Sequence, residues 1–243
     1  MLVAEGIHRL THGVVNFYLV EDGGRLTVVD AGAPGDWDLL VGGVGAVGRS
    51  LDDLETVLLT HAHSDHTGFA ERARSESGTT VRVHTADVTR ATTGATSKNE
   101  AGYGKYLLRM EAYRTLLGLM RTKGLKIVPI AEVSAFTDGE TLDVPGVPRV
   151  VHAPGHTEGS CALFFEGRGA LVTGDVLSTR NPLTGRTGPQ IAPDGLNLDS
   201  EQAMRSLEAI EPIRADVVLP GHGDPAGPGV AVAIRLARAA GRS

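Results

Sequence analysis

The alternation of apolar runs and turn residues in the first half of the chain predicts short strands. Val14 to Val20 is an apolar run, Asp22-Gly23-Gly24 has the composition of a hairpin turn, and Leu26 to Asp30 is expected to be the returning strand. The run from Leu54 to Thr60 indicates a buried strand. The same pattern predicts helices over residues 36–47 and 68–77 and a short strand over residues 81–83.

The second half repeats the strand-rich pattern and adds two helices. Asp199 is a typical N-cap residue, and Gln202 is placed to complete a capping box with it. Strands are expected over residues 126–130, 147–152, 162–166, 170–173 and 217–219, with helices over 199–211 and 230–240. With no clear linker between the halves, the pattern predicts one domain over residues 1–243, a two-sheet sandwich with helices outside.

The middle of the chain has a different character. Residues 91–97 are small and polar, as in a mobile loop, and the following apolar positions from Tyr103 to Met120 recur at spacings of three and four. That spacing predicts an amphipathic helix. Between Lys98 and Lys126 there are seven basic residues and two acidic ones, although the chain as a whole has a net charge of -6.

Composition narrows the function classes. The chain has 243 residues, 41% of them hydrophobic and 21% charged, which is typical of a globular protein. Its acidic balance argues against a nucleic-acid partner. The only cysteine, Cys161, cannot form an internal disulfide, which fits a reducing compartment. We see no signal peptide and no membrane span, so we expect a cytoplasmic protein with no membrane partner that acts on a small molecule.

The strongest chemical signal directly follows the run that ends at Thr60. The sequence His61-Ala62-His63-Ser64-Asp65-His66 places three imidazoles and a carboxylate within six residues. Imidazole and carboxylate are the ligands that zinc and similar divalent ions bind in hydrolytic sites. Three further residues of the same kind follow other apolar runs, namely His156, Asp175 and His222. The sequence therefore predicts a metal centre.

These motifs, in this order, resemble those of the metallo-β-lactamase fold hydrolases. The resemblance runs from about Val14 to Pro225 and rests on Asp30, the His61-x-His63-x-Asp65-His66 motif, and the three residues His156, Asp175 and His222. It implies an α/β fold, an αββα sandwich of two mixed β-sheets flanked by helices, with the metals at one edge. It also marks residues 85–126 as an inserted helical lid.

Carried over by position, the resemblance implies two metal sites. His61, His63 and His156 would bind one ion, Asp65, His66 and His222 the other, and Asp175 would bridge them together with a water or hydroxide. Two divalent ions are expected, zinc foremost, with iron and manganese as alternatives. Asp65 and Asp175 then lie at the catalytic centre. Asp30 would not be a ligand but would steady the histidine loop; capping of Ala31 and Gly32 is a second role compatible with the first.

The resemblance favours a hydrolase that directs the bridging hydroxide onto a small ester, lactone or thioester. The basic segment 98–126 would cover the site as a lid and favour an anionic substrate. Candidate substrate contacts are Tyr103, Tyr106, Arg109, Tyr113 and Ser178.

The resemblance leaves alternative activities open, and single residues weigh against some of them. Acyl-homoserine-lactone lactonases carry a Tyr where this chain has Ser178, and β-lactamases carry Cys or Ser where it has Asp175. Persulfide dioxygenases use a single iron, which ligands such as His61 and His63 bind as readily as zinc. A non-catalytic binding protein should have lost a ligand, and none is lost here. The sequence leaves the oligomeric state open.

Overall fold

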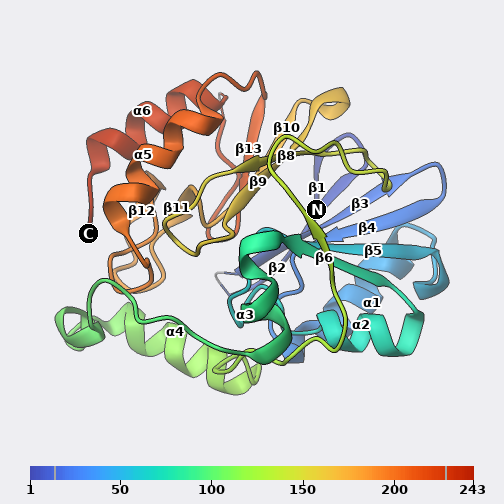
Figure 1. Cartoon of the computed structure of the whole chain (residues 1–243), viewed down its shortest axis with the longest axis horizontal. Coiled ribbons are helices and arrows are strands. Elements are labelled where there is room, and N and C mark those ends of the chain that lie inside the picture. Colours follow the sequence, from blue (N-terminus) through green and yellow to red (C-terminus); the bar gives the residue numbers. More distant parts are fainter. Residues whose placement is uncertain (14, 228) are drawn as a thin grey trace.

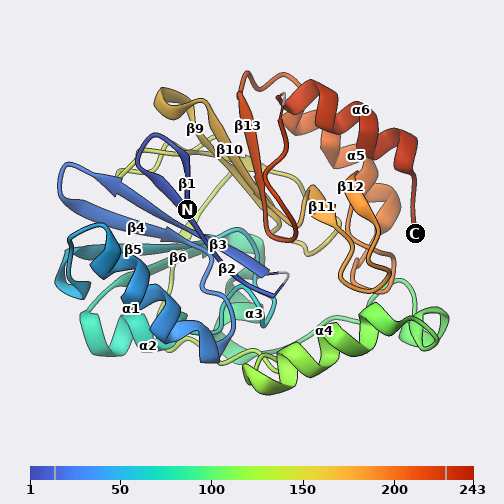
Figure 2. The same cartoon turned by 180° about the vertical axis from the view of Figure 1, so that it is seen from behind.

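The structure, a computed structural model, describes residues 1–13, 15–227 and 229–243. Two mixed β-sheets pack face to face, and helices cover the outer face of each sheet (Figures 1 and 2). The predicted αββα sandwich is therefore confirmed. Val14, where the first predicted strand begins, lies outside the described residues.

The first sheet is built from the first half of the chain and one later strand. Its order is β1-β2-β3-β4-β5-β6-β7, antiparallel from β1 to β4 and parallel from β4 to β7. The strands are β1 (Leu2–Ala4), β2 (Ile7–His12), β3 (Val15–Asp22), β4 (Arg25–Val29), β5 (Leu54–Leu59), β6 (Thr80–His84) and β7 (Ser134–Phe136). Helices α1 (Trp37–Ala46), α2 (Ala70–Ser77) and α3 (Val88–Thr93) belong to this half.

The second sheet has the order β13-β10-β9-β8, with β10 and β13 parallel and the other pairs antiparallel. Its strands are β8 (Arg149–His152), β9 (Cys161–Phe165), β10 (Ala170–Gly174) and β13 (Val217–Pro220). Helices α5 (Ser200–Ile210) and α6 (Val230–Ala240) cover it. A separate ribbon joins β11 (Ser178–Arg180) to β12 (Thr187–Gln190).

Apolar side chains fill three layers because successive residues of a strand point to opposite faces. In β3, Phe17 and Leu19 pack with the helices of the first half, whereas Tyr18 and Val20 pack between the sheets. The second sheet is likewise buried on both faces: Leu171 belongs to the cluster under α5 and α6. Continuous apolar runs in the sequence are the expected signature of strands with no solvated face.

Both sheets deliver their polar strand ends to one edge of the sandwich. Asp30 follows β4, Thr60 follows β5, and Asp175 follows β10. Backbone hydrogen bonds join the sheets at this edge: the Cys161 N–H donates to the Thr60 carbonyl (2.9 Å), and the Asn16 N–H donates to the Gly221 carbonyl (2.8 Å). The edge is thus a rigid seam in which residues far apart in sequence meet.

Several local predictions were wrong. Residues 126–130 form no strand: Pro129 has no N–H to donate, and Ile130 bonds instead to the carbonyl of Ala91 (3.0 Å). The polar stretch expected to be a loop from residue 91 begins inside α3. The helix expected over 103–120 is divided into a short 3₁₀ turn (Tyr103–Tyr106) and α4 (Met110–Arg121), because the backbone of Arg109 is extended.

α4 lies along the outside of the molecule and touches both halves of the sandwich (Figures 1 and 2). After its C-terminal end, the carbonyl of Thr122 accepts a hydrogen bond from the Gly35 N–H (2.8 Å) in the first half. The hydroxyl of Thr115 donates to the Pro182 carbonyl (2.5 Å) in the second half. That this segment moves as a lid stays a prediction.

Candidate metal centre

All seven predicted ligand side chains meet at the common edge of the two sheets. Their donor atoms form overlapping groups in which the atoms lie within 4.8 Å of one another. The groups are His61, His63 and His156; Asp65, His66 and His222; and His61, His66 and Asp175. The first two match the two sites implied by the sequence resemblance, and the third includes the proposed bridging carboxylate.

Asp175 lies between the two histidine groups. Its Oδ2 is 3.3 Å from Nε2 of His156 and 3.2 Å from Nε2 of His222. The other oxygen, Oδ1, is 3.7 Å from Nε2 of His66. Gly221 makes this approach possible, because a Cβ at that position would lie 2.5 Å from Oδ1 of Asp175. One carboxylate therefore reaches ligands from both sheets.

Outer hydrogen bonds fix the orientation of three of the imidazoles. When an Nδ1–H is donated outward, the Nε2 lone pair points into the cluster and is available to a metal. The outer partners are Thr60 Oγ1 for His61 (3.1 Å), Asp30 Oδ2 for His66 (2.9 Å) and Asn197 Oδ1 for His156 (3.0 Å). These rings are oriented as metal ligands by groups that are not ligands.

The inner atoms fit a divalent cation. With both Nδ1 atoms protonated, the Nε2 atoms of His61 and His156 face each other as two acceptors at 3.2 Å. Nε2 of His66 and Oδ1 of Asp175 are buried and have no hydrogen-bond partner among the described residues. Cations at the two sites would satisfy these four atoms, and nitrogen and oxygen donors of this kind suit zinc, iron or manganese.

The first histidine group is held neutral. Burial lowers the pKa of His61 and of His63 well below the usual histidine range, and neighbouring imidazoles add to the effect. Burial also lowers the pKa of His156. These three side chains have free lone pairs at neutral pH and bind a cation without first losing protons.

The second group has the opposite electrostatics. Burial disfavours the charged form of His66, but the surrounding carboxylates, Asp30 foremost, outweigh burial and raise its pKa to about 10. Burial also opposes the charge of His222, yet Asp175 raises the pKa of that imidazole. The pKa of Asp175 lies well below its usual value, since His222 and its neighbours outweigh burial. Because the raised pKa values of these two imidazoles favour their protonated forms, a cation that binds to this group has to displace protons.

Asp30 holds the histidine loop from beneath. Its carboxylate accepts the backbone N–H of Thr60 (2.8 Å) and the Thr60 hydroxyl, besides Nδ1 of His66. The residue is buried and has a φ of 63°, which is uncommon and costly for a residue with a side chain. The role implied by the sequence resemblance matches this geometry.

Two positioning residues were missed by the sequence analysis. Asp87 is fully buried and accepts hydrogen bonds from Ala62 N (2.8 Å), Thr157 Oγ1 (2.8 Å) and Gly159 N (2.9 Å), so it ties the histidine loop to the loop of His156. Its place three residues after β6 was the available signal, since Asp30 directly follows β4. Asn197 carried no comparable signal.

A cleft of about 480 Å³ opens beside the donor cluster. Asp65 and His222 line it from the cluster, and Arg9 and Arg180 line it from the strands nearby. Its opposite wall is the inner face of α4, formed by Glu111, Arg114, Thr115, Gly118 and Leu119. The cluster is therefore accessible from one side, as a catalytic rather than a structural metal site requires.

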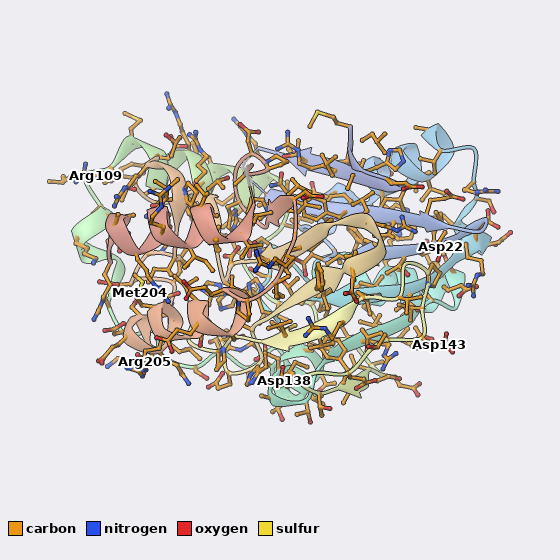
Figure 3. The ribbon with its side chains drawn as sticks, turned by 90° about the horizontal axis from the view of Figure 1, so that it is seen from above. Asp22, Arg109, Asp138, Asp143, Met204 and Arg205 are labelled. Carbon is orange, nitrogen blue, oxygen red and sulfur yellow. The ribbon has the colours of Figure 1, made fainter. Side chains whose placement is uncertain are left out.

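The predicted substrate contacts lie elsewhere than in this cleft. Tyr106 is buried and its hydroxyl donates to the Ser243 carbonyl (2.9 Å). Tyr113 is 51% exposed, Arg109 projects from the end of the molecule (Figure 3), and Ser178 is buried in β11. None of these four residues lines the cleft. The side chain of Tyr103 lies outside the part that the structure describes.

Comparisons with known proteins agree with this arrangement. Residues 10–222 match the pattern of the metallo-beta-lactamase superfamily. The chain is 29% identical over 229 residues to the Probable metallo-hydrolase YqjP of Bacillus subtilis, covering 88% of this chain and 68% of that protein. It is 25% identical over 210 residues to the atrochrysone carboxyl ACP thioesterase of Aspergillus fumigatus, covering 86% of this chain and 50% of that protein.

A solved structure shows the same fold. A metallo-beta-lactamase family protein from Thermus thermophilus superimposes with a TM-score of 0.67 at 23% identity, covering 95% of this chain and 77% of that one. Both mixed sheets and their flanking helices are therefore those of the metallo-beta-lactamase fold.

Substitution of Asp30 tests the hydrogen bond behind the metal ligand. In Asp30→Asn the outer partner of His66 loses its charge, and we expect metal affinity to fall about 10- to 100-fold. Competition with a chromogenic chelator measures the change. Asp38→Asn, at an exposed position of α1, is the matched control and should leave the affinity unaltered. Equal affinities for the two variants would contradict the assigned role of Asp30.

Acidification should distinguish the two histidine groups. Because His66 and His222 have raised pKa values, their affinity for zinc should fall about tenfold per pH unit for each displaced proton between about pH 8 and about pH 6. The first group, with lowered pKa values, should keep its ion over that range. Zinc content after dialysis at each pH measures this, and loss of all zinc in one step would contradict it.

Proposed function

The chain belongs to the metallo-beta-lactamase superfamily, and on that premise we propose that it is a dinuclear metal hydrolase of a small ester, lactone or thioester. The observation that carries the proposal is one bridging-type carboxylate, Asp175, shared by two histidine groups beside an open cleft. A structural zinc site is normally closed by four ligands, so seven donors at an open edge favour catalysis. The similarity to a thioesterase favours an acyl substrate.

Bound divalent ions would supply a water acidic enough to attack a carbonyl at neutral pH and would polarise that carbonyl. The chain's own residues fix the geometry. Asp175 stays ionised beside either histidine group, and the outward Nδ1 bonds keep the Nε2 atoms facing inward. Asp65 lines the cleft with Oδ2 3.5 Å from Nε2 of His222, where it can orient the attacking water and take up its proton.

The cleft also supports an anionic substrate, although not through the side chains expected from the sequence. Arg9 and Arg180 line it, and the Nε–H of each is buried without a hydrogen-bond partner among the described residues. Their terminal nitrogens bond to Asp224 and Glu111. We infer that a carboxylate or phosphate of the substrate binds near these two guanidinium groups.

Metal content and activity together test the proposal. We expect about two zinc ions per chain, hydrolysis of simple esters, lactones or thioesters, loss of activity with chelator and its return with zinc. His63→Ala should lower kcat/KM by at least about a hundredfold. Inductively coupled plasma mass spectrometry measures the metal content, and a screen of esters, lactones and thioesters measures the activity. About one iron per chain with oxygen-dependent persulfide oxidation would contradict hydrolysis, and turnover confined to acyl-homoserine lactones would narrow it to lactonase activity.

Arg180→Gln tests the preference for an anion. Loss of a charged hydrogen bond should raise KM at least about tenfold for an ester that bears a carboxylate, and little for its neutral analogue. Glu111→Gln is the matched control, because it breaks the same ion pair to α4 but keeps the guanidinium. An equal KM increase for both esters, or the same increase in Glu111→Gln, would contradict the proposal.

A further inference from the structure

The helix that walls the cleft carries its apolar face outward. Most of the large apolar side chains that are exposed among the described residues lie between 107 and 125. On α4 they form one stripe at spacings of three and four, made of Met110, Tyr113, Leu116, Leu117 and Met120. Just before the helix, Leu107 is 60% and Leu108 97% exposed. We call the five side chains on α4, together with Leu107 and Leu108, the outer stripe.

The polar side of the same helix faces the protein. Glu111 and Thr115 point inward, where they bond to Arg180 and to the Pro182 carbonyl. None of the residues of α4 is fully buried. A surface helix of a globular protein normally packs its apolar face on the core, so α4 has the reverse orientation. Soluble monomers rarely expose contiguous apolar surface of this kind unless it binds something.

Positive charge surrounds the outer stripe. Arg121 lies four residues after Leu117, on the same side of the helix. Arg109 and Lys123 stand at the two ends of the helix, and both are exposed. Within the described residues, Arg109, Arg121 and Lys123 form no ion pair with an acidic group. The stripe thus needs an occupant that is both apolar and negatively charged.

A second copy of the chain does not meet that need. The two acidic residues of the basic segment are engaged internally, Glu111 with Arg180 and Glu100 with Arg242. Two outer stripes brought face to face would therefore juxtapose arginines without intervening carboxylates, which is destabilising. An anionic lipid surface supplies both requirements, because acyl chains accept the apolar stripe and headgroups accept the cations.

We propose that α4 is an interfacial helix that docks the protein on anionic lipid membranes through its outer stripe. Among the described residues no helix is long and apolar enough to cross a bilayer, so the contact is peripheral. Lys and Arg flanking an exposed apolar helix face are the features that hold such helices at the headgroup boundary. The inference does not depend on the hydrolase reaction, since none of the residues of the outer stripe lines the cleft. This proposal differs from the expectation drawn from the sequence, which included no membrane partner.

Co-sedimentation of the full chain with lipid vesicles tests the proposal. We expect binding to vesicles of phosphatidylcholine with about 30% phosphatidylglycerol and little binding to phosphatidylcholine alone, with weakening by salt. Leu116→Ser with Leu117→Ser should lower partitioning at least about tenfold, because two apolar side chains no longer enter the bilayer. Arg121→Gln with Lys123→Gln should lower it about fivefold per charge removed.

The matched control is Val41→Ser with Leu236→Ser, two exposed apolar positions on α1 and α6. It should bind vesicles like the unaltered chain. The circular-dichroism spectrum and the melting temperature of Leu116→Ser with Leu117→Ser should match those of the unaltered chain, which verifies that the variant is folded. Equal partitioning of this variant and the control would overturn the proposal. So would a dimer in solution that the variant converts to monomer while the unaltered chain ignores anionic vesicles.

Discussion

The structure depends on holding seven candidate metal-ligand side chains together in one largely buried corner. Lone pairs face lone pairs there, and carboxylates lie next to imidazoles with little water to screen them. Such a cluster is unfavourable without a cation, and only a rigid surrounding keeps it from relaxing. The seam between the sheets, with backbone bonds from Cys161 to Thr60 and from Asn16 to Gly221, supplies that rigidity.

Buried polar residues behind the histidine loops, Asp30 and Asp87 among them, fix the orientation of the candidate ligands through hydrogen bonds. Asp30 and Asp87 follow β4 and β6, the two strands that flank β5, and each accepts three or more hydrogen bonds from the loops that carry the histidines. The strained backbone of Asp30 is the cost of placing its carboxylate under both Thr60 and His66. These residues also set the contrast between the two histidine groups, since the charge of Asp30 reaches His66 directly but His61 only through the Thr60 hydroxyl.

The sequence was informative where chemistry and periodicity act locally. The ligand cluster from His61 to His66 was evident because packing rarely explains four metal-donor side chains directly after a buried strand. Buried strands such as β5 are recognisable in the sequence because they are continuous apolar runs. Orientation was not predictable in the same way. The spacing of Tyr113 and Leu117 indicated an amphipathic helix, but nothing local tells which face turns to the body, and Asp87 acquires its role only through contacts with residues far along the chain.

One small contact connects the outer helix to the metal loop. Ser64, between His63 and Asp65, donates its hydroxyl to the carbonyl of Gly124 (2.7 Å), just beyond α4. If displacement of α4 shifts this loop, binding at the two places is thermodynamically linked, and linkage is reciprocal. Displacement of α4 would then change the affinity of the loop for a cation by some factor. Cation binding would change the equilibrium constant for the displacement of α4 by the same factor. The position of α4 on the surface would in this way report whether a cation is bound to the loop.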